Sequence, residues 1–454
     1  MNLLTWPWLE VTIILALIGA VSCTRLRQPL TAWLTGLVFS ASVLGASILA
    51  SAAFYWTVER NAPTFDYLQN SLFGRSIFGV DALNAPLLPL VGFLHFLTVF
   101  ATNRTKMRRF SASWSLASEA VRLAILSCQD QSILVVLLIG GVVFAGLELV
   151  DQGKPIRVYA VHMVAFSAGI LLGWWLVKRG EGDGLAVFGS ITMLSAILLR
   201  CGTVPFHTWL TDWVEHASFG NALLFILPLT GVYAAWRLVL PVAPTWVLQS
   251  LGAFSLITTI YAAAMATIQQ DPRRFFAFLF LSHVASVLLG IELHTPTTLT
   301  ASLLLWWNVT LSLGGLGLTL RALEARVGRL SLDRYHGLYE HCPLLAVCFL
   351  VTGLASVGFP GALGFVAADL LIEGAVASNI FIGVGLVLAT ALNGIAILRA
   401  YFSLFTGARH VSNVSLAITW RERLVVWTLI TLLAGSGVLA QLLVNSCYHV
   451  SPVP

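Results

Sequence analysis

The chain has 454 residues, of which 58% are hydrophobic and only 10% are charged. A soluble domain carries about 25% charged residues, so this composition excludes an ordinary soluble protein and predicts a polytopic membrane protein, with the lipid bilayer as its first partner. The formal net charge of +5 does not indicate nucleic-acid binding, because in a membrane protein the position of the basic residues matters more than their sum.

Apolar segments recur along the whole chain at the length of a membrane span, about 20 residues. The first, residues 6–23, lacks the basic start and small-residue cleavage site of a signal peptide, so we expect a retained span. In chain order the expected spans are residues 6–24, 30–53, 80–101, 113–128, 131–150, 157–177, 185–202, 218–239, 245–267, 274–292, 298–320, 343–375, 379–406 and 424–446. The pattern predicts one all-helical transmembrane domain over residues 1–454, with about fourteen helices.

The fourth expected span is interrupted by two charged residues, Glu119 and Arg122. They are three positions apart, so on a helix they lie on one face and can pair. We therefore keep this segment as a span.

The first interruption by helix breakers follows Arg200, where Gly202 and Pro205 stop an apolar helix. A cation in an apolar segment is costly in lipid, so it usually faces protein or a water-filled path. Because arginine stays protonated, we expect Arg200 to anchor an anion or to set a field in a pathway. The alternatives are a structural ion pair with Asp130 or Glu148, or a side chain that reaches the membrane interface.

The second interruption lies in residues 343–375, which are too many for one straight helix. Pro360, Gly361 and Gly364 divide the segment in two. Non-helical backbone at membrane depth is tolerated only within protein or along a cavity, and discontinuous helices are frequent in transporters built from repeats. The two breaks together predict an ion or solute pathway.

Two histidines lie where such a pathway would run: His207 follows the first break, and His283 is embedded in an apolar segment. Imidazole titrates near neutrality and can relay protons. Each histidine can also be an ordinary packed side chain with hydrogen-bond partners, and the sequence leaves both interpretations open.

The sequence contains no pattern that indicates enzyme chemistry. The six cysteines form no CxxC pair, which gives iron–sulfur or zinc ligation little support. We find no glycine-rich phosphate loop, paired-carboxylate site or Ser/His/Asp arrangement. We therefore expect no catalytic residue, no metal site and no cofactor in this chain.

Charge placement predicts the orientation of the spans. If the N-terminus is outside and the spans alternate, most of the 25 Lys and Arg residues fall in inside loops, including Arg104 and Lys106. This agrees with the positive-inside rule and predicts that both termini lie outside.

Four stretches carry a resemblance to a known family: FGVDALNAPLLPLVGFL (78–94), PFHTWLTDWVEHA (205–217), TIQQDPRRFFAFLFLSHVAS (267–286) and GLASVGFPGALGFVAADLLIEG (353–374). They resemble the antiporter-like membrane subunits of respiratory complex I and of Mrp-type cation/proton antiporters, the last stretch being similar to the chain M type. The resemblance covers about residues 78–407. It implies an inverted-repeat fold with two discontinuous helices, proton translocation in a cell inner (plasma) membrane, and other membrane subunits as partners. Any NADH or quinone chemistry would belong to those partners, so whether the chain is part of an oxidoreductase stays open.

The chain departs from that family at several positions where the family carries titratable residues. The fifth-helix Glu falls in residues 138–140, which are apolar; the seventh-helix Lys is Arg200, and the eighth-helix Lys is Leu229. The late broken helix offers only Asn393 between residues 381 and 398. A proton chain needs groups that gain and lose charge, so the resemblance supports the fold more than it supports a proton pump.

Three functions remain after these observations. The first is a membrane subunit of a proton-translocating assembly, with Arg200, His207, His283, Glu148, Asp130 and Asn393 as pathway residues. The second is a membrane subunit of a proton-driven inorganic-carbon uptake complex that pairs with a large soluble zinc protein. The third is a scaffold that has lost transport and only anchors its partners.

Overall fold

The computed structural model describes residues 6–60, 76–102, 110–180, 184–408 and 416–448, and the regular elements in these ranges are helices. Nine described helical segments, one of them the interrupted Phe219–Val239, are long and apolar enough to cross a membrane, and three shorter apolar helices accompany them (Trp8–Thr24, Leu87–Phe100 and Pro343–Ser356). The predicted all-helical, multi-pass membrane fold is confirmed, whereas the count of fourteen stays a prediction. Both chain ends and the basic loop with Arg104 and Lys106 lie outside the described residues.

The chain divides into two compact units. Unit 1 comprises Met1–Ile156 and Gly220–Leu238, and unit 2 comprises Arg157–Phe219 and Val239–Pro454. The expectation of one transmembrane domain stays a prediction, and each unit is described by itself below.

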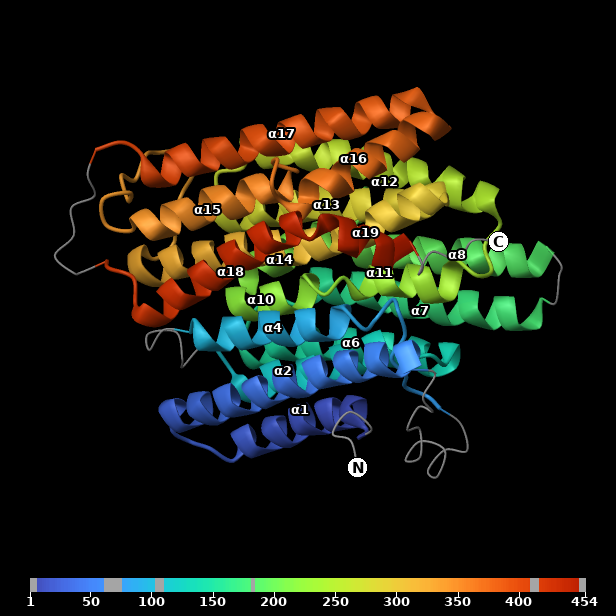
Figure 1. Ribbon diagram of the computed structural model, residues 1–454, viewed down its shortest axis with the longest axis horizontal. Coiled ribbons are helices and arrows are strands. Elements are labelled where there is room, and N and C mark those ends of the chain that lie inside the picture. Colours follow the sequence, from blue (N-terminus) through green and yellow to red (C-terminus); the bar gives the residue numbers. More distant parts are fainter. Residues whose placement is uncertain (1–5, 61–75, 103–109, 181–183, 409–415, 449–454) are drawn as a thin grey trace. The chain divides into compact units, whose positions relative to one another are not determined.

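Unit 1 is built on a group of packed helices in which α5 is central. Helix α5 packs against α1, α2, α4, α6 and α11, and the blue and cyan ribbons of Figure 1 show α1, α2 and α4 in this group. The bounds are α1 (Trp8–Thr24), α2 (Pro29–Arg60), α4 (Leu87–Phe100), α5 (Ala112–Ser127), α6 (Gln131–Asp151), α10 (Phe219–Ile226), α11 (Thr230–Ala234) and the π-helix η2 (Ala235–Val239). The fourth expected span, with its two charged residues, is therefore the helix α5.

The segment from α10 to η2 differs from the expected continuous span over residues 218–239. Helix α10 ends at Ile226, and Leu229 has a left-handed backbone with φ +49° before α11 begins. The physical reason is Pro228, which lacks the N–H that a helix interior needs and clashes with the preceding turn. The interruption is a third break in an apolar segment, and the sequence analysis did not predict it.

Unit 2 contains the larger set of helices. Their bounds are α7 (Arg157–Arg179), α8 (Gly184–Cys201), α9 (Thr208–His216), α12 (Thr245–Ile268), α13 (Pro272–Leu293), α14 (Pro296–Val327), α15 (Pro343–Ser356), α16 (Leu363–Ser378), α17 (Ile380–Phe405), α18 (Trp420–Val438) and α19 (Ala440–Tyr448). In the most apolar stretches of α13 and α14, 94% of the residues are buried, against 28% in α7. Helices α13 and α14 are thus the interior of the unit, and α12 and α17 pack beside α13 (Figure 1).

The starts of α13 and α14 follow from their sequence. The Asp271 carboxylate accepts hydrogen bonds from the backbone N–H groups of Arg273 and Arg274 at 2.8 and 3.1 Å, and Pro272 occupies the first turn. Thr295 caps α14 in the same way, ahead of Pro296. Capping side chains satisfy the free N–H groups of a first turn, and proline is well suited to that turn, so both long helices begin at defined positions.

Ion pairs anchor α9 to α13 and α13 to α14. Arg274 Nε donates to Glu215 Oε2 at 2.6 Å, and Arg273 Nη2 donates to Glu324 Oε1 at 2.6 Å. Arg273 also donates to the backbone oxygens of Glu215 and Ala217 at the end of α9, at 3.0 and 2.9 Å. The amphipathic helix that follows the first break is therefore fixed to the interior helix of the unit.

Candidate functional site

The first break in unit 2 separates α8 from α9 through a tight turn. Gly202 has φ +79°, a conformation that side chains rarely adopt, and a Cβ placed there would lie 2.8 Å from Leu281 Cδ2. The turn closes with a hydrogen bond from Thr203 N to Leu198 O at 3.0 Å, and the Val204–Pro205 peptide is cis. Only glycine fits at position 202 without strain, which explains why α8 ends where it does.

Arg200 lies against an aromatic wall at the end of α8. Its side chain is 7% exposed, and the guanidinium carbon is 5.5 Å from the centre of the Trp209 ring. Trp209 donates from Nε1 to Leu199 O at 2.9 Å, which holds the ring in place. A cation over a tryptophan face is stabilised by the ring quadrupole, so the fixed charge is buried within protein.

The two acids proposed as partners for Arg200 lie in unit 1. Asp130 caps α6 by accepting from Ser132 N and Ile133 N at 2.9 and 3.0 Å. Glu148 is 6% exposed and accepts from Gln152 Nε2 at 2.8 Å. Both have local roles in α6, and an ion pair of either with Arg200 stays a prediction.

His207 follows the first break and faces α12. Its Nε2 is 3.4 Å from the hydroxyl of Tyr261, and the two rings meet edge to face with centres 5.1 Å apart. The backbone of the break contacts the same helix, because Val204 N donates to Thr258 Oγ1 at 2.9 Å. The first break is therefore joined to the middle of α12 by polar contacts.

His283 in α13 contacts the second break. Its Nε2 donates to Ser356 O at 2.9 Å, and its Nδ1 is 2.8 Å from Leu279 O. Asn308 in α14 donates from Nδ2 to the neighbouring Ala355 O at 3.0 Å. Two interior helices thus bind the last carbonyl groups of α15.

The backbone after α15 depends on glycine at several points. Gly358 and Gly361 have φ +84° and +95°, and Pro360 lies between them. A Cβ at Gly364 would lie 2.4 Å from Ala355 O and 2.5 Å from Asn308 Nδ2. The residues predicted to break this segment lie between α15 and the first turn of α16, at the point where α16 approaches α15 and α14.

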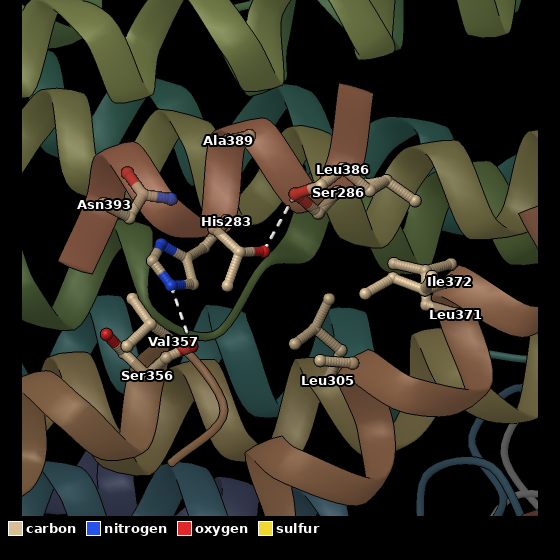
Figure 2. A pocket seen from close by; sticks show the side chains of 12 residues that line it. His283, Ser286, Leu305, Ser356, Val357, Leu371, Ile372, Leu386, Ala389 and Asn393 are labelled. Atoms are coloured by element: carbon tan, nitrogen blue, oxygen red, sulfur yellow. Dashed lines mark hydrogen bonds between the residues drawn. The ribbon is translucent and has the colours of Figure 1, made fainter. Parts of the chain in front are cut away.

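A small cavity of about 30 Å³, lined by both polar and apolar residues, lies beside His283. Figure 2 shows His283, Ser286 and Asn393 on its upper side, the backbone at Ser356 below them, and leucine and isoleucine side chains closing the other end. A cavity of this volume holds about two water molecules if polar partners are present. His283, Ser286 and Asn393 supply such partners, so the cavity can be hydrated.

Asn393 connects the cavity to α12. Its Nδ2 donates to Ser282 Oγ at 2.8 Å, and Ser282 Oγ donates to Thr259 O at 2.9 Å. Thr259 is next to Thr258, which accepts from the first break. We call the set Val204, His207, Thr258, Thr259, Tyr261, Ser282, His283, Ser356 and Asn393 the polar row. It extends from one break to the other through α12 and α13, and its members Thr258–Thr259 and Ser282–His283 are linked by the main chain and not by hydrogen bonds.

The comparisons with known proteins concern this same region. Residues 162–393, from α7 to Asn393, match the family described as NADH:quinone oxidoreductase/Mrp antiporter, TM. The match covers both breaks of unit 2 and the whole polar row. The chain belongs to this family.

Individual members of the NADH:quinone oxidoreductase/Mrp antiporter family are distant in sequence. The chain is 28% identical over 40% of its length to F(420)H(2) dehydrogenase subunit M of Methanosarcina mazei, and 28% identical over 48% of its length to NADH-quinone oxidoreductase subunit M of Rickettsia typhi. These matches span 38% and 45% of the relatives' own lengths, less than half of each. The predicted resemblance to the chain M type is confirmed.

The fold of the chain is more similar to solved structures than its sequence is. A chain of respiratory complex I from Thermus thermophilus with bound NADH superposes with a TM-score of 0.84 at 20% identity, covering 98% of both chains. At this identity the likeness shows the fold alone, and it confirms the antiporter-like architecture.

Two positions at which the resemblance implies a titratable residue are apolar in this chain, one inside a helix and one between two helices. Residues 138–140 are in the middle of α6, and Leu229 is the left-handed residue before α11.

In the residues that the structure describes, no three His, Cys, Asp or Glu side chains lie close enough to hold a metal ion.

The sequence analysis did not single out Glu292 in α13. This residue is 1% exposed, and neither carboxylate oxygen has a hydrogen-bond partner among the described residues. Its Oε2 faces the backbone of α12 at Gly252, where a Cβ would lie 3.5 Å away. The sequence does carry one sign of this buried acid, a single Glu in the apolar run VLLGIEL. In the sequence, however, a Glu at that place looks like an exposed residue at the end of a helix.

Proposed function

We propose that the chain is a membrane subunit of a proton-translocating assembly of the chain M type. The observation that carries this proposal is the polar row: two broken helices joined by hydroxyl, imidazole and amide groups, with a cavity that admits water. In many transporters, discontinuous helices expose backbone and polar groups to the transported ion. The family match over the same residues supports it.

In this proposal Arg200 supplies a fixed positive charge and does not carry a proton. His207 and His283 are the titratable groups of the row, and Asn393, Ser282 and water complete its hydrogen bonds. Arginine keeps its proton at physiological pH, whereas imidazole gains and loses one. The proton therefore moves through the histidines and water, and Arg200 modulates the field at the first break.

The partners and the membrane follow from the same family. We propose other membrane subunits as neighbours, a cell inner (plasma) membrane as the location, and both termini outside. One solved chain with this fold belongs to respiratory complex I from Thermus thermophilus and another to the Mrp complex from Dietzia, which supports a multi-subunit assembly. Oxidoreductase chemistry, where the assembly has it, belongs to other subunits.

A second candidate is the inorganic-carbon uptake complex. The observation that favours it is the position of Arg200 over the Trp209 ring at the first break, since a fixed buried cation can bind a bicarbonate ion. The apolar residues 138–140 also agree with this candidate, since they provide no titratable group for a proton pump. In that case a large soluble zinc protein co-purifies with the chain.

The test is flux in the reconstituted assembly. The complex is purified from membranes, its subunits are identified, and proton flux into vesicles is followed with a pH-sensitive dye. We expect His283→Gln to lower the flux on the order of 10²-fold, the range of a single proton-transfer group. The matched control is His162→Gln, since His162 is a half-buried histidine on α7 outside the polar row.

Each outcome of the flux test separates the candidates. Equal flux in His283→Gln and the wild type contradicts the proposed pathway. A co-purifying zinc protein with bicarbonate-dependent flux identifies the uptake complex. An assembly that forms but carries no flux identifies a scaffold.

A further inference from the structure

A cluster of charged side chains lies inside unit 1 and shares no residue with the polar row. His95 extends from α4, Ser115, Glu119 and Arg122 extend from α5, and Glu148 extends from α6. Ser115, Glu119 and Arg122 occupy positions i, i+4 and i+7 of α5, so they share one face of that helix. This face of α5 lies toward α4 and α6, which carry His95 and Glu148.

The centre of the cluster is an ion pair between His95 Nδ1 and Glu119 Oε2, whose side chains are both 0% exposed. The other ring nitrogen, Nε2, lies 2.7 Å from Ser115 Oγ. Arg122 is 5% exposed, and the charges of Glu119 and Glu148 both act on it. Within the described residues, Arg122 Nε and Nη2 have no hydrogen-bond partner.

The partners of His95 can both donate and accept hydrogen bonds. A hydroxyl can be donor or acceptor, and a carboxyl group accepts when ionised and donates when protonated. The imidazolium ring therefore donates to Glu119 and Ser115. After loss of one proton, the ring keeps Nδ1–H toward Glu119 and accepts from the Ser115 hydroxyl. Both ring nitrogens have a polar neighbour in either state, the Ser115 hydroxyl at Nε2 and the Glu119 carboxylate as ion-pair partner at Nδ1; a buried polar group without such a neighbour costs about 1–3 kcal/mol.

The protonated ring balances the charges of the cluster. His95 and Arg122 then carry two positive charges against the carboxylates of Glu119 and Glu148. When the ring is neutral, Arg122 faces both carboxylates alone, and Glu148 keeps its hydrogen bond from Gln152 at 2.8 Å. Buried charges need compensation, so the balance favours binding of the proton.

The other helices packed against α5 bring few titratable groups. Helices α1, α2 and α11 contact α5, and α6 also carries acids at its two ends. In the described part of unit 1 these groups are Glu10 and Cys23 on α1, Tyr55 on α2, Tyr233 on α11, and Asp130 and Asp151 at the ends of α6.

We infer that the His95–Glu119 pair is a proton-binding site of unit 1, with Arg122 as a nearby fixed positive charge. The ligand is a single proton on the His95 ring: it leaves from Nε2, which then accepts from the Ser115 hydroxyl, while Nδ1–H stays toward Oε2 of Glu119. The site is separate from the polar row of unit 2. The inference does not rest on the proposed transport, because the pair can bind a proton whether or not the chain moves ions.

The site also supplies the buried acid that is missing at the apolar residues 138–140 of α6. Unit 1 lacks an acid in the middle of α6, and α5 brings Glu119 into the interior one helix earlier. A buried titratable group is therefore present in unit 1 although that position of α6 is apolar.

The test is a proton titration of the purified assembly in lipid nanodiscs, followed by proton uptake and by infrared difference spectra of the carboxyl groups. We expect His95→Asn to take up one proton fewer per chain than the wild type, and Glu119→Gln to lose the carboxylate band that shifts when the ring is protonated. The matched control for the band is Glu292→Gln, which removes a buried carboxyl of unit 2 and leaves the band of Glu119 in place. Equal proton uptake in His95→Asn, or an unchanged band in Glu119→Gln, overturns the inference.

A second measurement keeps the inference falsifiable if Glu119→Gln fails to assemble. Solid-state NMR of the wild-type protein with ¹⁵N-labelled histidine reports the protonation of each ring, and the signal of His95 is assigned by its loss in His95→Asn. We expect the His95 signal to change when the pH of the sample is varied. A His95 signal that stays constant identifies a permanent ion pair and overturns the inference. Flux is not measured here, so failure of the proposed function leaves this result unaffected.

Discussion

Two buried histidines, one in each unit, have opposite surroundings. His95 in unit 1 is 0% exposed and faces a carboxylate and a hydroxyl. His283 in unit 2 is 5% exposed and faces two backbone carbonyl oxygens. Carbonyl oxygens only accept hydrogen bonds, so a neutral His283 ring leaves one nitrogen opposite an acceptor, while a charged ring satisfies both contacts without a carboxylate. The first site is suited to exchanging a proton, and the second ties the protonation of the ring to the backbone of a broken helix.

The largest effect is expected from breaking the ion pair of unit 1 on one side. Glu119→Leu leaves His95 and Arg122 buried without that carboxylate, and removal of one partner of a buried pair costs about 3–5 kcal/mol. The double variant His95→Leu, Glu119→Leu should lose less, because both members of the pair are replaced by apolar groups. The free energy of unfolding in detergent titrations measures both, and a double variant less stable than Glu119→Leu contradicts the prediction.

The next largest effect concerns the second break of unit 2. Gly364→Ala places a Cβ 2.4 Å from Ala355 O, and overpacking of this kind costs about 1–3 kcal/mol. The matched control is Gly394→Ala in α17, where no atom lies within 4 Å of the added Cβ; there alanine should stabilise the helix by up to about 1 kcal/mol. Thermal unfolding of the two variants should shift in opposite directions, and equal shifts would show that the close approach is absent.

A smaller effect is expected where the polar row crosses from α17 to α13. Asn393→Leu removes the donor to Ser282 Oγ, a hydrogen bond worth about 0.5–1.5 kcal/mol in stability. Because the substitution also makes one wall of the cavity apolar, proton flux should fall by more than stability does. Flux at the wild-type level with reduced stability would restrict Asn393 to a structural role.

The smallest effect is expected at Arg200. Arg200→Lys keeps the positive charge but loses the planar contact with Trp209, so stability should change by about 0.5–1 kcal/mol. If the fixed charge is what the first break needs, flux is retained in Arg200→Lys and falls in Arg200→Met. Equal loss of flux in the two variants would instead make the guanidinium group itself necessary.

The sequence predicted the breaks of unit 2 well because they depend on local chemistry. Glycine and proline decide backbone conformation within a few residues, so Gly202, Pro205 and Pro360 were visible without a structure. The break at Leu229 was missed although Pro228 precedes it, because hydropathy over residues 218–239 is that of an uninterrupted span.

The side-chain partners could not be predicted in the same way. Glu119 and Arg122 were expected to share a face of one helix, and they do, but the contact of Glu119 with His95 depends on how α4 packs against α5. Asn393 was noted from the resemblance, whereas Ser282 and Thr259 carry no signal in the sequence. Helix packing selects these partners, and periodicity contains no information about it.

The end of α15 has one more consequence. The final carbonyl groups of a helix carry about half a negative charge between them, from the aligned peptide dipoles. Helix α15 ends within the interior of unit 2, where Ser356 O and Ala355 O point at His283 and Asn308. This negative pole comes from the main chain, so no change of pH can neutralise it and no side-chain substitution can delete it. The interior of unit 2 therefore retains a permanent attraction for cations beside His283 and Asn308.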